Sequence, residues 1–291
     1  MAVKSRRFAL LEGVAAGILF GTAAIFIRLI DLNPLSIALW RLIVASLVLA
    51  LILLVLRKKV SARLIGNNTK HFLVLGALLG AHFILFVSAV KNTTILNATV
   101  LVNTAPIFSM IVSTFLYSVK PSRLALAGMA LSFIGAGLIA YRDAERGETA
   151  NLVGDLEATL AAVAEGFYLN YGRERRGRIP LLPTMLFIYL AAGVMVGATT
   201  ILATRTFEAP NNLELLIPLI GLGALPTATA HTLYFSSLSG LKSFETSTMA
   251  LLEPLGATLL GIAIFAEVPT PFFVVGAALV LVGIFSIALG R

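Results

Sequence analysis

The chain contains no cysteine among its 291 residues. It therefore has no disulfide framework, no thiolate metal site and no cysteine nucleophile. Charged residues are also scarce, at 12%, compared with about 25% in an ordinary soluble domain. Hydrophobic residues make up 58% of the chain, and the mean hydropathy is +0.97. This composition excludes a soluble globular protein and predicts an all-α integral membrane protein.

Several enzyme motifs are absent as well. The sequence holds no HExxH, no GxSxG, no Walker A motif and no Gly-rich dinucleotide loop. We therefore expect no cofactor, no metal site, no catalytic residue and no enzyme activity, and any transport is expected to be driven by a gradient or to be passive. The net charge of +8 is better explained by cytoplasmic Lys and Arg of a membrane protein than by a nucleic-acid partner.

Apolar stretches of about 20 residues, the length that crosses a bilayer as a helix, recur along the whole chain. Each is continuously apolar rather than alternating, so helices are predicted instead of barrel strands. The first stretch follows a basic region but lacks a clear cleavage site, and we interpret it as a span and not as a signal peptide. Ten transmembrane helices are predicted, at residues 10–30, 34–56, 71–90, 94–117, 123–141, 152–171, 181–203, 213–236, 243–265 and 270–289.

Lys and Arg are unevenly distributed between the two ends of these spans. When the N-terminus and every second loop are assigned to one side, that side holds 16 of the 22 Lys and Arg residues. Loops rich in Lys and Arg stay in the cytoplasm. Both termini are therefore predicted to be cytoplasmic, and the predicted location is the cytoplasmic membrane. The six residues on the other side are Arg28, Arg41, Lys91, Arg142, Arg146 and Arg205.

Prolines and glycines recur at one fixed offset, which indicates a duplication. Each predicted half then has five spans, an odd number, so the second half enters the membrane from the opposite side. We predict two inverted repeats, 1–146 and 147–291, a plan common among secondary transporters. Pro106, Pro121, Gly128 and Gly135 match Pro254, Pro269, Gly276 and Gly283, each 148 residues later.

Polar and ionisable side chains interrupt the middle of several spans. An ionisable group there costs about 2.5–3.5 kcal/mol, so such groups are expected to face a wet cavity or one another. In the sixth and eighth spans they fall on one helix face each, together with Glu157 and Thr227. A hydrogen-bond network between helices, without a ligand, gives the same pattern. The candidate substrate-binding residues are His82, Asn103, Thr104, Glu165, Tyr168, His231, Tyr234 and Glu253.

Two of the repeated prolines stand beside these polar residues. Pro106 and Pro254 each remove the helical hydrogen bond to the carbonyl four residues earlier. A free carbonyl or a bend at mid-membrane suits a binding site or a structural hinge, and a passive kink is the alternative. Glu253 has Ala105 as its counterpart, so the repeat does not impose its charge. We place the predicted cavity between the two broken spans, the fourth and the ninth.

Two further patterns concern packing and orientation. Gly13, Gly17 and Gly21 form a stripe of small residues, for which tight helix packing is the favoured interpretation. The fifth and tenth spans carry almost no polar side chain and are also expected to be packing elements. Arg41 lies about two turns inside the second span, where it either snorkels outward or pairs with an acid or an anionic substrate group.

These residues resemble the drug/metabolite transporter superfamily, and within it the EamA-type exporters with ten helices. The resemblance covers nearly the whole chain and departs at Val119, which stands where the second half has Glu267. It implies a cavity lined by helices one, three, four, six, eight and nine, and substrates such as amino acids, other metabolites or drugs. It rests on PLSIALWRLIVA at 34–45, on Leu252-Glu253-Pro254, on Glu267 and on Gly276 to Gly283.

The favoured hypothesis is a secondary transporter that exports amino acids or related small metabolites by alternating access, with the proton as candidate coupling ion. The alternatives are a transporter of drugs or nucleotide-sugar-like solutes, an intramembrane enzyme acting on lipid-linked substrates, and a membrane scaffold without transport. The expected partners are a small-molecule substrate and the lipid bilayer, for a monomer or a homodimer.

Overall fold

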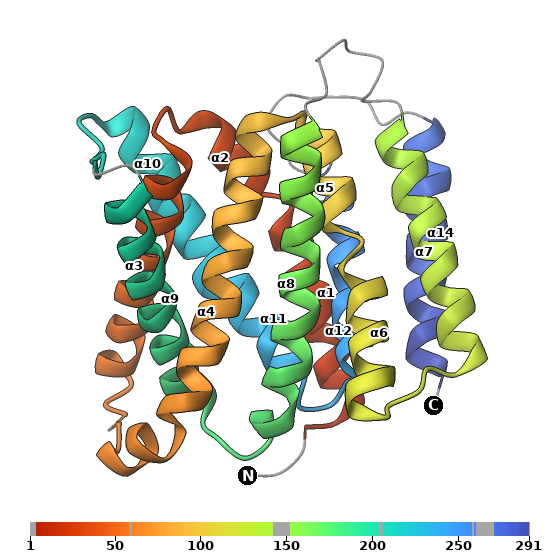
Figure 1. Ribbon diagram of the computed structural model, residues 1–291. Helices are drawn as coiled ribbons and strands as arrows, with labels where there is room; N and C mark the ends of the chain where they lie inside the picture. The colour runs from red at the N-terminus through yellow and green to blue at the C-terminus, as the bar shows by residue number, and fades with distance from the viewer. Residues whose placement is uncertain are drawn as a thin grey trace.

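A computed structural model describes residues 4–58, 60–141, 152–203, 206–257, 259 and 271–290, and the regular structure within these ranges is helical (Figure 1). Glu267 and most of the predicted loop between the ninth and tenth spans lie outside the described residues. The helices are α1 (Arg6–Phe20), α2 (Ala23–Leu29), α3 (Pro34–Val55), α4 (Ala62–Asn92), α5 (Ile95–Val102), α6 (Ala105–Tyr117), α7 (Arg123–Tyr141), α8 (Leu152–Arg176), α9 (Leu181–Ala203), α10 (Leu213–Leu222), η2 (Gly223–His231), α11 (Thr232–Ser237), α12 (Ser243–Thr248), η3 (Met249–Leu252) and α14 (Pro271–Leu289).

Within the described ranges, six helical stretches are long and apolar enough to cross a membrane. Helix α8 is also long, at 25 residues, but it carries acids along its length and three arginines in its last turn. The count of ten transmembrane helices therefore remains a prediction. The six stretches are Arg6–Leu29, Pro34–Val55, Ala62–Asn92, Asn97–Tyr117, Leu181–Ala203 and Leu213–Ser237, and shorter apolar helices cover Arg123–Gly135 and Val274–Leu289.

The fourth predicted span is interrupted at its centre. Helix α5 ends at Val102, and α6 begins at Ala105 with Pro106 in its first turn. Proline is tolerated there because the amide groups of a first helical turn have no intrahelical acceptor. The backbone break therefore lies just before the proline, at Asn103 and Thr104.

The ninth predicted span changes its winding near the other repeated proline. Helix α12 tightens into the 3₁₀ segment η3, which ends at Leu252, and residues 253–257 are helical again. Pro254 thus stands at the start of the new helical segment. The polar residue beside it, Glu253, lies at the junction itself.

The eighth predicted span departs from the regular helix assumed from its periodicity. Pro218 lies inside α10 and Pro226 inside η2, a π-helix of nine residues. Each proline removes one backbone donor, and the wider winding of a π-helix changes which side chains share a face. The predicted stripe assumed a uniform period of 3.6 residues, and η2 does not have that period.

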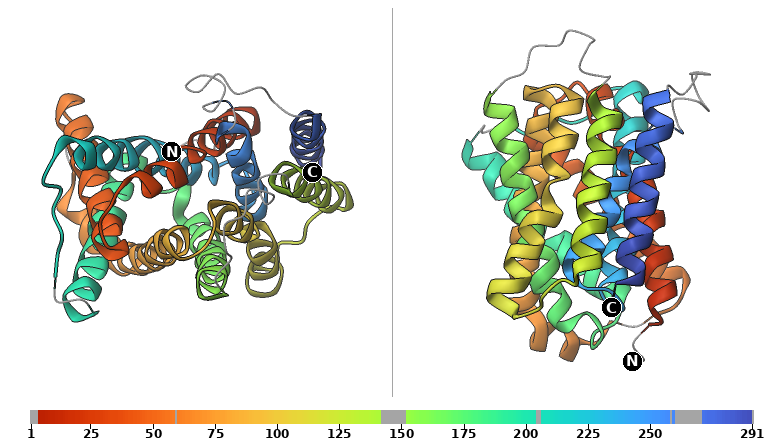
Figure 2. Two further views of the ribbon diagram at one scale, coloured as in Figure 1. Left: turned by 90° about the horizontal axis from the view of Figure 1, so that it is seen from above. Right: turned by 90° about the vertical axis from the view of Figure 1, so that its right-hand side faces the viewer.

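Glycines set the close contacts between helices. In α1, Gly13 and Gly17 face Met249, while Gly21 faces Gly256 and Ala257. The tight-packing interpretation of this stripe is thus confirmed. At one edge of the molecule, α7 (yellow-green) and α14 (blue) lie side by side in both views of Figure 2. Between these two helices, Gly128 packs against Gly283 and Gly135 against Gly276.

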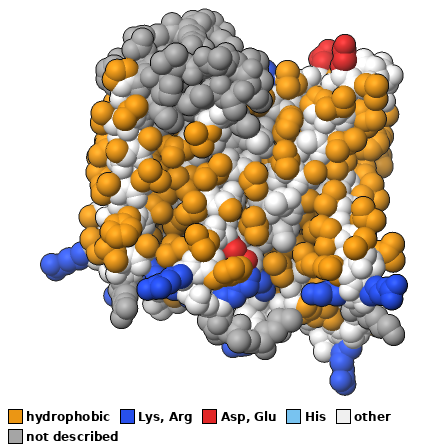
Figure 3. All heavy atoms as spheres, turned by 180° about the vertical axis from the view of Figure 1, so that it is seen from behind, with side chains coloured by type: hydrophobic (Ala, Val, Ile, Leu, Met, Phe, Trp, Pro, Cys, Tyr) orange, Lys and Arg blue, Asp and Glu red, His pale blue; other side chains and the backbone are white. Residues whose placement is uncertain are grey.

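The two ends of the bundle differ in charge. Both termini lie at the same end in Figure 1, and Lys and Arg side chains gather at the corresponding end in Figure 3. Hydrophobic side chains cover the flank between the ends in Figure 3, as expected for a surface in contact with lipid. Large apolar residues with exposed side chains include Leu54, Phe115 and Val194.

Candidate functional site

The two interrupted helices meet at the centre of the bundle. The Nδ2 atom of Asn103, at the break between α5 and α6, donates a hydrogen bond of 2.9 Å to Oε2 of Glu253. Both side chains are buried. The residues are 150 positions apart and come one from each predicted half. The contact therefore joins the two irregular backbone segments, each of which carries one of these polar residues.

A second carboxylate lies near the first. Glu165 on α8 accepts a hydrogen bond of 2.6 Å from the hydroxyl of Tyr234 on α11. Its other oxygen is 3.8 Å from Nδ1 of His82 on α4. That nitrogen also lies 3.0 Å from the carbonyl oxygen of Ala161. A carbonyl only accepts hydrogen bonds, so Nδ1 of His82 carries the hydrogen.

Aromatic rings enclose the second histidine. The ring of His231, at the end of η2, lies 4.8 Å from Phe20 and 4.9 Å from Phe83, between ring centroids. The centroid of His82 lies 6.0 Å away. Among the described residues, no group bonds to the buried Nδ1 of His231. This histidine therefore has a nitrogen available to a bound molecule or to water.

Arg41 points into the bundle, and the interpretation that it snorkels outward is wrong. The residue is 1% exposed, and its guanidinium carbon lies 3.7 Å above the ring of Phe83. Its Nε donates a hydrogen bond of 3.1 Å to Thr227 on η2. In the described part of the chain, its Nη1 has no hydrogen-bond partner, and no carboxylate lies within 4.0 Å of it.

These side chains line one small cavity of about 40 Å³. A cavity needs about 10–15 Å³ to hold one water molecule, so this one accommodates only a few. The helices therefore stand closed around the polar groups. The polar lining is Arg41, His82, Asn103, Glu165, His231 and Glu253, and the apolar lining is Phe20, Ala23, Phe86, Val102 and Ala250.

Three of the predicted mid-span polar residues lie outside the lining of this cavity. The hydroxyl of Tyr168 contacts Sδ of Met185 at 3.9 Å, and its ring packs against Phe235. Thr104 donates to the carbonyl of Leu101. Glu157 accepts hydrogen bonds from Ser88 and Asn92, away from the cavity. Tyr234 and Thr227 do not line the cavity but hold Glu165 and Arg41, which do.

Partly buried ion pairs at the basic end were not predicted. Arg6 on α1 binds both oxygens of Glu245 on α12, at 3.1 Å and 2.9 Å. It also donates to the carbonyl of Ile287 at the end of α14. Lys4 binds Glu12, which also accepts from Ser236 on α11. These contacts tie α1, α11, α12 and α14 together at that end of the bundle.

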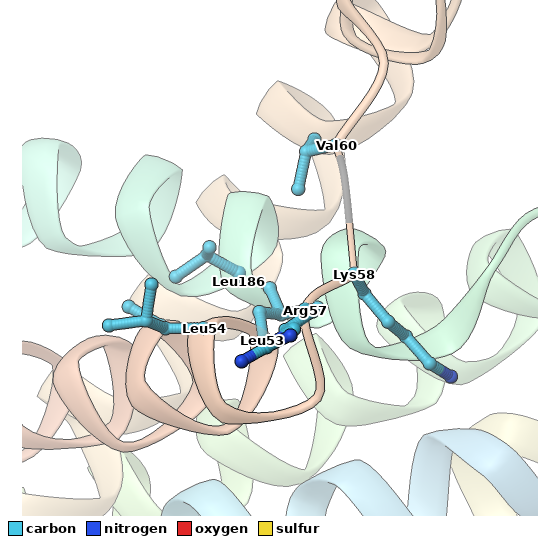
Figure 4. Close-up of a pocket in the computed structure, with 7 residues that line it drawn as sticks. Leu53, Leu54, Arg57, Lys58, Val60 and Leu186 are labelled. Carbon is cyan, nitrogen blue, oxygen red and sulfur yellow. The ribbon is translucent and has the colours of Figure 1, made fainter.

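A larger hollow lies on the outside of the molecule, away from these groups. It measures about 440 Å³ and is formed by the ends of α3 and α9 (Figure 4). Its lining contains no carboxylate and no histidine, so it lacks the chemistry of the central cavity. The lining residues are Ala50, Leu53, Leu54, Arg57, Lys58, Val60 and Leu186.

Comparison with known proteins places the chain in a family. It matches the EamA-like transporter family over residues 7–141 and again over 152–289. It is 22% identical over 256 residues to YoaV, an uncharacterized transporter of Bacillus subtilis (strain 168), which covers 88% of this chain and 87% of that protein. It is 23% identical over 273 residues to an uncharacterized transporter of Archaeoglobus fulgidus, with 93% of each covered.

A solved crystal structure has the same fold. It superimposes with a TM-score of 0.80 over 98% of each chain, at 20% sequence identity. The family match spans nearly the whole chain, and the related proteins are named as transporters rather than as enzymes. The chain therefore belongs to the EamA-like transporter family of the drug/metabolite transporter superfamily and is a multi-pass membrane protein.

Proposed function

We propose that the protein is a secondary transporter that exports amino acids or related small metabolites across the cytoplasmic membrane by alternating access. One observation carries the proposal. Buried carboxylates, histidines and an arginine from α3, α4, α8, η2 and the two interrupted helices line a single cavity. Charged groups are expensive inside a membrane, and discontinuous helices at mid-membrane are typical substrate sites of secondary transporters.

The reciprocal glycine contacts support an inverted-repeat mechanism. Gly128 and Gly135 correspond in the repeat to Gly276 and Gly283, 148 residues later. Gly128 packs against Gly283, and Gly135 packs against Gly276. A two-fold relation between the halves requires such crossed pairs. The same relation lets a site at the centre open toward either face by an exchange of conformations between the halves.

The direction of the chain in the membrane follows from its charges. The end that carries most Lys and Arg also carries both termini, and we place it in the cytoplasm. The contacts of Arg6 with Glu245 and of Lys4 with Ser236 tie the N-terminal segment to α12 and α11 at that end in the conformation described. Export then requires these contacts to part and admit the substrate from the cytoplasm.

We propose the proton as the coupling ion, carried by Glu165 and Glu253. Glu165 is bonded to a tyrosine hydroxyl and Glu253 to an asparagine amide. Neither partner carries a compensating charge, so protonation changes the net charge of the cavity. A group that gains and loses a proton as the cavity changes sides couples transport to the proton gradient.

The proposal is tested with the purified protein in liposomes loaded with a mixture of labelled amino acids. The variants are Glu253→Gln and Glu165→Gln, singly and together, and the matched control is Glu157→Gln. Glu157 lies on the same helix as Glu165 but outside the cavity. We expect the first two to lower efflux at least tenfold and the control to retain it. Efflux at the wild-type rate from the double variant would contradict the site.

A further inference from the structure

The outer hollow at the ends of α3 and α9 combines an aliphatic wall with two cations. Its volume of about 440 Å³ lies within the range of about 300–1,000 Å³ that is typical of pockets for small molecules. No side chain that lines the central cavity also lines this hollow. The charged members are Arg57 and Lys58, and the aliphatic members are Ala50, Leu53, Leu54, Val60 and Leu186 (Figure 4).

The two cations are open to a partner from outside the chain. Arg57 and Lys58 are both exposed, and within the described ranges no carboxylate forms an ion pair with either of them. In Figure 4, the side chain of Lys58 extends away from the leucine side chains. The positive charge beside the hollow is therefore not neutralised by the described residues.

The backbone at the end of α3 fixes where these cations stand. The N–H of Arg57 donates to the carbonyl of Leu54, and the N–H of Lys58 donates to the carbonyl of Leu53, both at 3.0 Å. These two bonds form a Schellman cap, which places Arg57 in the left-handed region, at a φ of 50°. Glycine is the usual residue there, because a side chain makes this conformation strained. A long charged side chain at such a position indicates a use for its charge.

The hollow stands where a membrane-spanning helix ends. Helix α3 is apolar enough to cross a membrane, and it ends at Val55, two residues before Arg57. In Figure 1, the connection from α3 to α4 lies at the end of the bundle that holds both termini. The end of a span lies near the lipid headgroups, and the preceding turns lie among the acyl chains. Leu54, which is 74% exposed, thus faces acyl chains, while Arg57 and Lys58 stand near the headgroups.

We propose that this hollow binds one anionic phospholipid of the leaflet at the basic end. The phosphate lies between Arg57 and Lys58, and one acyl chain follows the aliphatic wall. A guanidinium meets a phosphate through two parallel hydrogen bonds, and a lysine adds a point charge. Basic pockets between transmembrane helices are typical sites for anionic headgroups. A free phosphate ion would use the cations and leave the aliphatic wall bare, so a lipid fits the whole hollow better.

Native mass spectrometry of the full-length protein, purified in detergent, tests the proposal without any variant. The protein is titrated with dioleoylphosphatidylglycerol or with dioleoylphosphatidylcholine, which has the same acyl chains and no net charge. One cation near an anionic headgroup strengthens binding about fivefold, so two should favour phosphatidylglycerol more than tenfold. Equal affinity for the two lipids would overturn the proposal, and so would displacement of the bound lipid by inorganic phosphate.

Variants locate the site. Arg57→Gln combined with Lys58→Gln should abolish the preference for phosphatidylglycerol. The matched control combines Arg63→Gln with Lys70→Gln, which removes the same charge from exposed positions on α4 outside the hollow. We expect the control to keep the preference. An equal loss in both pairs would mean that the lipid responds to the overall charge of this end, and the site would be wrong.

A second copy of the chain is the other occupant that an aliphatic hollow could take. Ala50→Trp fills the hollow and keeps both cations, and it should lower the affinity for phosphatidylglycerol at least tenfold. Unchanged affinity would place the lipid elsewhere. A dimer of the lipid-free wild-type protein that Ala50→Trp separates would assign the hollow to a protein interface and overturn the lipid site. None of these measurements involves transport, so their failure leaves the proposed transport function standing.

Discussion

Two buried tyrosines, one on α11 and one on α8, provide a matched test of the cavity. Tyr234 and Tyr168 were both predicted as binding residues, and both are almost fully buried. The hydroxyl of Tyr234 donates a 2.6 Å hydrogen bond to Glu165. Among the described residues, the hydroxyl of Tyr168 has one hydrogen-bond partner, the sulfur of Met185, at 3.9 Å. Replacement of each tyrosine by phenylalanine removes one oxygen atom and keeps the ring.

The two substitutions should therefore differ in effect. A hydrogen bond to a charged group contributes about 1.5–3 kcal/mol, and we expect Tyr234→Phe to lower the free energy of unfolding by that amount. Thioether sulfur is a weak acceptor, and we expect Tyr168→Phe to change it by less than about 0.5 kcal/mol, the scale of an ordinary neutral substitution.

Reversible unfolding of the purified protein in mixed micelles measures the difference, and amino-acid efflux measures its consequence. Because Tyr234 holds a carboxylate of the cavity, Tyr234→Phe should also slow efflux, whereas Tyr168→Phe should retain it. Equal losses of stability in the two variants would refute the reasoning from hydrogen-bond partners. Equal losses of efflux would place Tyr168 in the site after all.

Two further predictions concern packing and the basic end. Gly135→Ala should lower the free energy of unfolding by about 1–3 kcal/mol, because its methyl group overlaps Gly276. Gly137→Ala, on the same helix and facing open space, should raise it by about 0.8–1 kcal/mol through helix propensity; thermal denaturation in detergent checks both signs. Glu245→Gln leaves the partly buried Arg6 without its ion pair. In a protein that also carries Ala250→Cys in the cavity wall, it should speed thiol labelling from the face that holds both termini; an unchanged rate would show that this pair does not close that end.

The sequence predicted the broken helices because their causes are local. A proline inside an apolar stretch removes a backbone donor wherever the stretch packs. Pro106 and Pro254 therefore marked both irregular segments, and the polar residues beside them, Asn103 and Glu253, are in contact. The sequence also predicted the close helix contacts at the glycine stripes, because small residues four apart on a helix let another backbone approach closely.

The inward position of Arg41 was not fixed by its surroundings in the sequence. Helix α3 is apolar on all sides, so no polar face indicates which way a residue two turns from its end points. The hydrogen bond to Thr227 holds Arg41 in its inward orientation, and Thr227 lies in the π-helix η2. The π-helix in turn depends on tertiary packing, which the hydrophobic periodicity of the sequence does not reveal.

Tyr168 illustrates the opposite case, because a stripe about 80° wide on a helix is broad enough to face two neighbours. Glu165 turns toward α11 and the cavity, while Tyr168, three residues later, turns toward Met185 on α9. Glu245 was missed because its partner, Arg6, lies 239 residues away and belongs to a terminus that the sequence places only by charge.

Thiol labelling tests the central claim, access to one cavity from both sides, most directly. The chain has no cysteine, so Ala250→Cys, in the cavity wall, gives the only thiol in the protein. A cavity of about 40 Å³ does not admit a maleimide, so reaction requires the helices to part. The buried Ala228→Cys, outside the lining, is the control. We predict that a membrane-impermeant maleimide labels Ala250→Cys from either face, that a transported amino acid slows the reaction, and that the control stays unlabelled. Labelling from one face only, in protein that still transports that amino acid, would contradict alternating access through this cavity.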